Sequence, residues 1–192
     1  MKKIYIIRHG ESEFNEINKG KYTLFCGQSD CALSKNGIKQ AEELKYINTL
    51  FDFAYISDSI RTKKTFEHST LKSKEIIFTK DLRERSLGEF EGKNVKTFFE
   101  DDKHKKYWLS GEKGDFKHSF VNRAPLGENY KDVCDRVEKV IKMIDQTPDN
   151  SKILIISHYI AIRCLLFKMG KIEKKNIFNY KVTNCDPIII HY

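Results

Sequence analysis

Two apolar segments of this 192-residue chain each lead into a histidine. Ile4–Ile7 is followed directly by Arg8 and His9. Ile153–Ile156 is followed, after one serine, by His158. A neutral imidazole can act as a nucleophile, and a guanidinium offers planar donors that match phosphate oxygens. A single histidine after a strand is more often structural, so the interpretation depends on what else reaches the same place.

Arg61 adds a further cation near the end of a third apolar segment. The segment 51–57 reads as a strand, and Arg61 falls in the first turn of the helix expected after it. The carboxyl ends of parallel strands share one edge of a sheet, so these cations and histidines are expected to converge there. Clustered positive charges repel one another away from water unless an anion compensates them. The pattern therefore indicates a phosphate site.

Carboxyl groups follow the third expected strand, in the segment 82–92. This segment supplies Glu84, Glu89 and Glu91. Transfer of a phosphoryl group to histidine leaves an alkoxide, which needs a proton from a nearby acid. The residue types alone leave all three carboxyls as candidates.

The order of the expected elements defines the fold class. Strands are expected at 3–7, 51–57, 75–79, 152–157 and 187–192, and helices at 35–48, 58–69, around 95–101, 129–145 and 158–169. Strands that alternate with helices predict a three-layer α/β/α sandwich with a mainly parallel central sheet. We expect one domain over 1–192, with 93–128 as a small lid insertion and 11–33 as an irregular loop.

Composition excludes several classes of protein. No apolar stretch approaches the roughly 20 residues of a membrane span, so we expect a cytoplasmic protein with no membrane partner. The five cysteines are odd in number and form no C-x-x-C pair, which argues against a zinc site or a disulfide framework. The net charge of +8 permits nucleic-acid binding, but the lysines are scattered, so an anionic small substrate is favoured. A homodimer is compatible with the sequence.

Six motifs run through the chain in a fixed order. They are "RHGES" with Asn15, "GQSDCALSxxGxxQA" (27–41), "SDSxRxxxT" (57–65), "LRExxxGxxEG" (82–92), "GEN" (127–129) and "SHYxxxR" (157–163). Together they resemble the histidine phosphatase superfamily, also called the phosphoglycerate-mutase-like family. The resemblance covers essentially the whole chain.

The resemblance implies a role for each matching residue. His9 would be the nucleophile that becomes phosphohistidine, and Glu84 would protonate the leaving oxygen and later activate water. The phosphoryl group would be held by Arg8, Arg61, His158, Asn15, Ser12 and Gly27. Neither a metal ion nor another cofactor is implied.

Four positions bear on the choice between hydrolysis and transfer. The family's glycolytic mutases carry a tyrosine and a lysine where this chain has Leu87 and Val95, which favours a phosphatase. The loop around Cys26 instead resembles the mutase type, with cysteine in place of the usual threonine. Tyr159 replaces the usual glycine after the second histidine. Lys117, His118 and Arg123 lie in the basic lid, where they could contact the distal end of a substrate.

Two further groups of residues are expected to have structural roles. Tyr107, Trp108 and Phe116 are aromatic residues expected to pack within the lid. Arg83 and Arg163 are expected to partner carboxylates.

The predicted function is that of a histidine acid-type phosphatase. It would hydrolyse a small phosphorylated metabolite through phosphohistidine without a metal ion. One alternative is a cofactor-dependent phosphoglycerate mutase. An alternative of another class is a non-catalytic module that binds phosphorylated ligands.

Overall fold

The structure is a computed structural model that describes residues 1–98, 100 and 116–192. Its central sheet has five strands. The strands are β1 (Lys3–Arg8), β2 (Leu50–Ser57), β3 (Lys72–Thr79), β4 (Lys152–Ser157) and β5 (Ile188–His191). Their order across the sheet is β3-β2-β4-β1-β5. Four strands run parallel, and β5 pairs antiparallel with β1. The predicted mainly parallel sheet is therefore confirmed.

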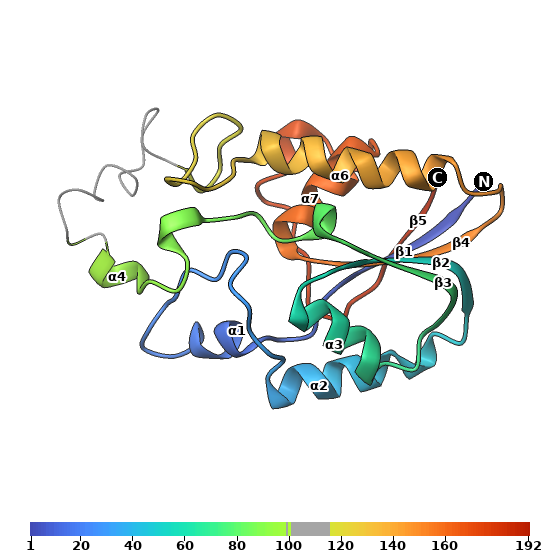
Figure 1. The fold of residues 1–192 in the computed structure, drawn as a ribbon, viewed down its shortest axis with the longest axis horizontal. Coiled ribbons are helices and arrows are strands. Elements are labelled where there is room, and N and C mark those ends of the chain that lie inside the picture. The colour runs from blue at the N-terminus through green and yellow to red at the C-terminus, as the bar shows by residue number, and fades with distance from the viewer. Residues whose placement is uncertain (99, 101–115) are drawn as a thin grey trace.

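Helices cover both faces of this sheet. The helices in the described residues are α1 (Glu13–Ile17), α2 (Lys35–Glu42), α3 (Ile60–His68), α4 (Val95–Phe98), α6 (Tyr130–Asp145) and α7 (Tyr159–Lys168). In Figure 1, α6 and α7 lie on one side of the sheet and α2 and α3 on the other. Short 3-10 turns occupy Glu43–Tyr46, Lys80–Leu82, Gly88–Phe90 and Lys174–Asn176. The layers form the expected α/β/α sandwich.

The sequence of strand β1 is continuously apolar because both faces of the strand are buried. Ile4 and Ile6 pack with the core on the α6 and α7 side, whereas Tyr5 and Ile7 pack with the core on the α2 and α3 side. Successive side chains of a strand point to opposite faces, so a strand covered on both sides needs apolar residues at every position. This double burial makes β1 a rigid support for the residues after it.

The helices differ from the sequence expectation in three places. Helix α1 lies in the segment expected to be irregular, because it is a five-residue helix held by a cap rather than by a buried apolar face. Its Ser12 side chain accepts from the backbone N–H of Asn15, and the Asn15 side chain accepts from that of Ser12. The helix expected at 35–48 changes to a 3-10 turn after Glu42. Helix α4, expected around 95–101, is described over Val95–Phe98, and Glu100 already lies in a turn.

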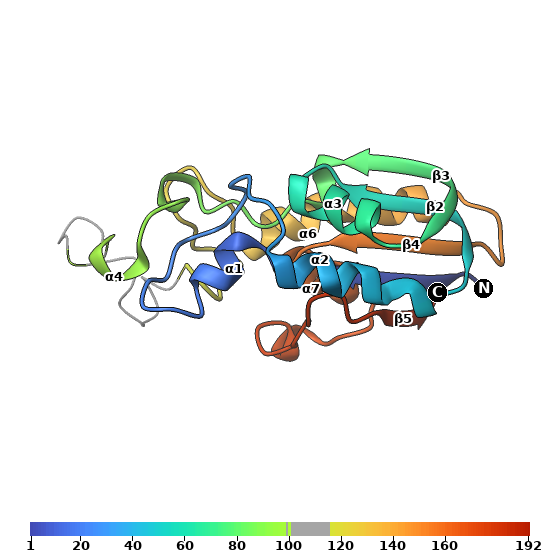
Figure 2. The same ribbon diagram turned by 90° about the horizontal axis from the view of Figure 1, so that it is seen from below.

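The carboxyl ends of β1, β2 and β4 face the end of the molecule where α1 and α4 lie (Figures 1 and 2). Phe116 is buried there against Phe25 and Phe90, which confirms the predicted packing role of this lid residue. Tyr107 and Trp108, predicted to pack similarly, lie outside the described residues.

Candidate active site

A cavity of about 920 Å³ opens at the carboxyl edge of the sheet. Six of the eight residues expected at the site line it: Arg8, His9, Asn15, Gly27, Arg61 and Glu84. Arg8 ends β1, Arg61 lies in the first turn of α3, and Glu84 follows the turn after β3. Residues from three separate segments of the chain are thus brought to one wall by the sheet topology.

The imidazole of His9 is held in one tautomer. Its Nδ1 lies 2.7 Å from the carbonyl oxygen of Gly10, which can only accept a hydrogen bond. Nδ1 therefore carries the proton, and Nε2 keeps its lone pair. Burial lowers the pKa of His9 well below its usual value, and the charges of Arg61 and Arg8 lower it further. The ring is thus a neutral imidazole with a nucleophilic nitrogen.

Close backbone packing fixes the loop that carries His9. The Gly10 N–H donates to Thr65 Oγ1 at 2.9 Å. A Cβ atom at Gly10 would lie 2.4 Å from the carbonyl oxygen of Gly37, so glycine is needed for the loop to approach α2. Asn184 also donates to the His9 carbonyl at 2.7 Å.

Arg61 is fully buried, and the protein engages most of its N–H groups. Its Nη1 and Nη2 donate to the carbonyls of Ser29 and Gly27, both at 2.9 Å. Nη1 also approaches Cys31 Sγ at 3.7 Å, and Nε donates to His158 Nδ1 at 3.2 Å. Within the described part of the chain, one Nη2 N–H is left to meet an anion in the cavity.

Arg8 is the less restrained cation. Its Nη1 donates to the Val182 carbonyl at 2.9 Å, and its buried Nε has no hydrogen-bond partner among the described residues. Burial lowers the pKa of Arg8, although the nearby Glu84 opposes that change. A buried donor without a partner is costly, and a phosphate oxygen would satisfy it.

The structure does not bring Ser12 and His158 to the cavity wall as expected. Ser12 is fully buried, and its hydroxyl caps α1. His158 accepts from Arg61 at Nδ1 and therefore donates from Nε2 to Ser57 Oγ, 2.9 Å away. Burial lowers the pKa of His158 well below its usual value, so it is a neutral residue that positions Arg61.

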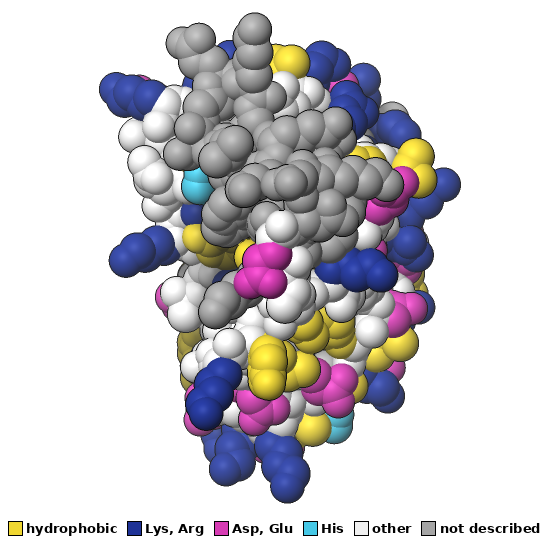
Figure 3. Space-filling model, turned by 90° about the vertical axis from the view of Figure 1, so that its left-hand side faces the viewer, with side chains coloured by type: hydrophobic (Ala, Val, Ile, Leu, Met, Phe, Trp, Pro, Cys, Tyr) yellow, Lys and Arg dark blue, Asp and Glu magenta, His cyan; other side chains and the backbone are white. Residues whose placement is uncertain are grey.

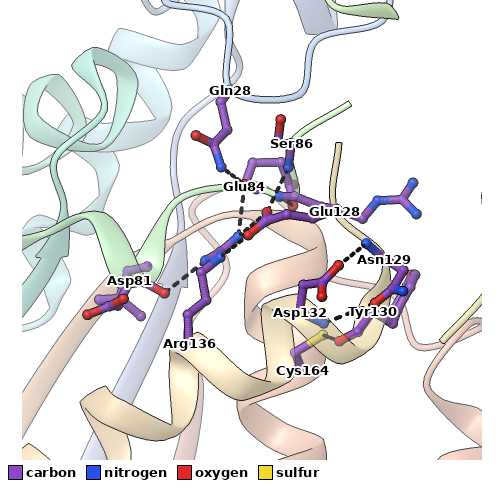
Figure 4. A network of polar contacts seen from close by, with 12 residues as sticks. Gln28, Asp81, Glu84, Ser86, Glu128, Asn129, Tyr130, Asp132, Arg136 and Cys164 are labelled. Carbon is purple, nitrogen blue, oxygen red and sulfur yellow. Dashed lines mark hydrogen bonds and ion pairs between the residues drawn. The ribbon is translucent and has the colours of Figure 1, made fainter. Parts of the chain in front are cut away.

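Glu84 is fixed through both its side chain and its backbone. Oε1 accepts from the backbone N–H groups of Arg85 and Ile160 at 2.8 and 3.1 Å, and the Glu84 carbonyl accepts from Gln28 and Arg136, both at 2.9 Å. Figure 4 shows Arg136 reaching the Glu84 backbone from α6. The site can therefore hold a carboxyl group in a set position.

Glu128, from the "GEN" motif, completes the support of Glu84. Its carboxylate accepts from Nε and Nη2 of Arg136 at 2.9 and 3.0 Å. Its Oε2 also accepts from the backbone N–H of Ser86 at 2.9 Å. This motif thus fixes the loop after Glu84 and does not enter the cavity.

The other carboxyls of this loop have different positions. Glu91 Oε1 accepts from the backbone N–H groups of Gln28 and Leu87 at 2.9 and 2.8 Å. Glu89 is exposed. Gly27 packs under Glu91 with a φ of +51°, where a Cβ would lie 2.3 Å from Glu91 Oε1. Of the three candidate acids, only Glu84 lines the cavity.

The basic lid residues divide between the cavity and the protein. Lys117 lines the cavity. His118 stacks on Phe178 with ring centres 5.4 Å apart, and Arg123 pairs with Asp132 at 3.0 Å. Only Lys117 of these three is therefore placed to meet a substrate in this arrangement.

Arg85 is a cavity residue that the sequence interpretation missed. It is 3 % exposed, and its Nη1 donates to the backbone carbonyls of Phe116 and Lys117 at 2.7 and 3.2 Å. Its buried Nε has no hydrogen-bond partner within the described ranges. The only available signal was its position directly after Glu84, which did not distinguish it from a solvated arginine.

Arg83 and Arg163 were both expected to partner carboxylates. Arg83 does so, with two hydrogen bonds to Asp58 of 2.6 and 2.7 Å. Arg163 does not: it donates to the Tyr180 carbonyl at 2.7 Å and to the Tyr159 hydroxyl, and its guanidinium lies over the Tyr159 ring. Arg163 therefore holds the Tyr159 ring in place where that ring lines the cavity.

The rest of the cavity wall mixes apolar and charged groups. Leu87 and Val95 both line it, as do Lys21 and Glu100. Figure 3 looks at this end of the molecule and shows Lys and Arg side chains around its margin, with Asp and Glu among them. No cluster of metal-ligating side chains occurs among the residues that the structure describes.

This arrangement and the comparisons with known proteins agree on the class. The family model of the histidine phosphatase superfamily (branch 1) matches residues 4–192, and the chain belongs to that superfamily. A phosphoglycerate mutase from Schizosaccharomyces pombe is 31% identical over 98% of this chain and 89% of its own length.

Two solved structures of phosphatases share the fold. The α-ribazole phosphatase from Shigella flexneri has a TM-score of 0.79 at 22% identity, covering 98% of this chain and 90% of that one. A phosphoserine phosphatase from Entamoeba histolytica, solved with 3-phosphoglyceric acid, has a TM-score of 0.75 at 25% identity, with the same coverage. No helix in the described ranges is long and apolar enough to cross a membrane.

Proposed function

We propose that this protein hydrolyses phosphate monoesters through a phosphohistidine on His9, without a metal ion. The observation that carries the proposal is the state of His9, a neutral imidazole with its Nε2 lone pair retained beside two arginines. A nucleophile beside cations, with a carboxyl on the same cavity wall, suits attack on a phosphoryl group.

The first step forms the phosphoenzyme. His9 Nε2 attacks phosphorus, the bond to the ester oxygen breaks, and that oxygen takes a proton from Glu84. Arg8 and the remaining Nη2 N–H of Arg61 offset the negative charge on the other phosphoryl oxygens. His158 contributes through its hydrogen bond to Arg61.

The second step is hydrolysis. Glu84, now ionised, takes a proton from water as that water attacks phosphorus and the bond to His9 Nε2 breaks. Phosphate leaves, and Glu84 is again protonated. Asn15 assists through its side-chain NH2 group, because its Oδ1 is already bound to the Ser12 N–H.

The substrate in this proposal is a small phosphorylated metabolite. A cavity of about 920 Å³ lies within the range typical of small-molecule sites. Lys21, Arg85 and Lys117 line it together with the phosphate residues, and they suit a substrate with further negative charge. We place the reaction in the cytoplasm because the five cysteines are unpaired thiols.

A mutase is the second candidate, supported by the S. pombe relative that carries this name. A mutase must retain its phosphorylated intermediate while that intermediate turns round. Leu87 and Val95 line the cavity at the positions where the glycolytic mutases have a tyrosine and a lysine, and they offer no hydrogen bond. This apolar stretch of wall favours hydrolysis.

The test is a phosphate-release screen over phosphorylated metabolites, with conversion of 3-phosphoglycerate to 2-phosphoglycerate measured alongside. We expect phosphate release that persists in EDTA and falls by about 10⁴-fold or more in His9→Ala. Conversion without phosphate release would identify a mutase. Binding of phosphorylated ligands without either reaction would identify the non-catalytic module.

A further inference from the structure

The segment 182–185, which precedes β5, passes the carboxyl end of β1 next to the nucleophile. Val182 is buried in the core on the α6 and α7 side of the sheet. Cys185 packs against the core on the α2 and α3 side. The segment is therefore anchored on both faces of the sheet.

The backbone of this segment binds the end of β1. The Val182 carbonyl accepts from Arg8 Nη1 at 2.9 Å, and the Cys185 N–H donates to the Arg8 carbonyl, also at 2.9 Å. Cys185 has a φ of +51°, in the left-handed region that residues with a Cβ seldom adopt. The contacts with β1 thus hold the segment in a conformation that is unfavourable on its own.

The side chain of Asn184 reaches from this segment to the nucleophile. Its Nδ2 donates to the His9 carbonyl at 2.7 Å, although 175 positions separate the two residues in the sequence. That carbonyl belongs to the peptide unit between His9 and Gly10, and the N–H of the same unit donates to Thr65 Oγ1 at 2.9 Å. Because a peptide unit is planar and rigid, hydrogen bonds at its oxygen and at its N–H together fix its orientation.

The orientation of this peptide unit controls where the His9 ring lies. The ring Nδ1 is 2.7 Å from the Gly10 carbonyl, which follows the unit directly. A rotation of the unit would move that carbonyl away from the ring and release the imidazole. Asn184 does not line the cavity, so it acts on Nε2 through the backbone alone.

Thr65, the second support of the peptide unit, is also connected to Arg61. Its buried hydroxyl donates to the Arg61 carbonyl at 2.7 Å, and this bond joins the His9 loop to the first turn of α3. A substitution of Thr65 would therefore disturb Arg61 as well as His9. Asn184 offers the more selective way to release the His9 carbonyl.

We propose that Asn184 is a positioning residue for the nucleophile, which aligns His9 Nε2 with the phosphorus atom by holding the His9 carbonyl. The proposal rests on the phosphohistidine chemistry of the proposed function and adds a residue that acts on its first step. In-line attack tolerates little misplacement of the attacking nitrogen. Arg8 keeps its contacts with the backbone of 182 and 185 when the Asn184 side chain is removed, so substrate binding should be retained.

Steady-state kinetics on an alkyl phosphate and on 4-nitrophenyl phosphate test this role. In Asn184→Ala and Asn184→Asp we expect kcat to fall about tenfold or more on both esters, with KM within about twofold of the wild type. Aspartate keeps the shape of asparagine and, as a carboxylate, offers no donor. Losses of equal size on the two esters distinguish Asn184 from Glu84, whose effect depends on the leaving group. Thr183→Ala removes an exposed neighbouring side chain and should change neither kcat nor KM.

Hydrogen exchange of the Gly10 amide, followed by NMR, tests the contact without turnover. Loss of the Asn184 hydrogen bond frees the peptide unit, so we expect this amide to exchange at least about tenfold faster in Asn184→Ala. The amide of Ile6, inside β1, should keep its exchange rate. An unchanged rate at Gly10, or an equal rise at Gly10 and Ile6, would overturn the proposal, because Asn184 would then support at most the fold as a whole.

The two proposals can fail separately. A wild type that releases no phosphate would overturn the proposed function, and the exchange of the Gly10 amide would still decide whether Asn184 holds the His9 loop. An active wild type with normal kcat in both Asn184 variants would overturn the positioning role alone. If Asn184→Ala does not fold, Asn184→Asp carries both measurements.

Discussion

The guanidinium carbon of Arg8 lies 5.0 Å from the centre of the Tyr159 ring, at the cavity wall. The same ring lies 4.0 Å from the guanidinium carbon of Arg163, which also donates to the Tyr159 hydroxyl. An aromatic face attracts a cation, so Tyr159 orients Arg8 while leaving its N–H groups available. The bulky residue at this position is thus part of the cavity wall and holds Arg8 there.

Replacing Tyr159 with leucine should weaken substrate binding. The contact of a cation with an aromatic ring contributes about 1 kcal/mol, so we expect KM to rise about fivefold as Arg8 loses its orientation. Tyr159→Phe keeps the ring and should stay near the wild type. Steady-state kinetics on one phosphomonoester would measure both, and equal KM values for the leucine and phenylalanine variants would contradict the role of the ring.

The convergence of site residues was predictable because it follows from topology. Arg8 lies at the end of β1 and Arg61 just beyond the end of β2, two parallel strands that β4 separates, and the apolar character of those strands is visible in the sequence. Parallel strands must bring their carboxyl ends to one edge, whatever the side chains between them do. The positions of His9 and Arg61 followed from that rule alone.

Hydrogen-bond partners could not be predicted in the same way. Arg8 donates to the carbonyl of Val182, which is 174 residues away, and Arg163 finds tyrosines and a carbonyl in place of the expected carboxylate. Backbone carbonyls occur at every residue and leave no mark in the sequence. Ser12 bonds to the backbone N–H of Asn15, and His158 bonds to the side chains of Arg61 and Ser57, so their roles also emerged only from the structure.

Glu84→Gln should slow turnover most for substrates with poor leaving groups. An alkyl phosphate needs a proton on its leaving oxygen, so we expect its rate to fall by about 10²- to 10³-fold, whereas 4-nitrophenyl phosphate should be affected much less. The matched control is Glu89→Gln, an exposed carboxyl in the same loop. Equal losses on both substrates would show that Glu84 does not act as the acid.

The two buried histidines should make the fold less stable as the pH falls. Burial, with the nearby arginines, holds the pKa of both His9 and His158 well below the usual value. Below about pH 6.5 the unfolded chain binds protons that the folded protein does not. The free energy of unfolding should then drop by about 1.4 kcal/mol per pH unit for each histidine.

Urea denaturation at about pH 7.5 and about pH 5.5 measures this dependence. His9→Asn should lose roughly half of the predicted pH dependence, because one of the two groups is gone. His68→Asn removes an exposed histidine on α3 and should leave the dependence unchanged. A wild-type stability that is constant over this range would show that the two imidazoles titrate normally in the folded protein.

Arg136→Met should lower both the stability of the protein and the rate of the step in which Glu84 donates its proton. Arg136 donates to the Glu84 carbonyl and pairs with Glu128 while its side chain is only 12% exposed. We expect stability to fall by about 1–3 kcal/mol as Glu128 loses its partner. We also expect kcat on an alkyl phosphate to fall about tenfold as Glu84 moves from the leaving oxygen.

Lys139→Met is the matched control for Arg136, because it removes a cation from the same helix at a side chain that is 67% exposed. It should change neither stability nor rate by much. The decisive measurement is the ratio of rates on the alkyl and 4-nitrophenyl esters, which loss of stability alone does not alter. A lower ratio in Arg136→Met, with an unchanged ratio in Lys139→Met, identifies Arg136 as a positioning residue for the acid. An unchanged ratio in both variants assigns Arg136 to stability only.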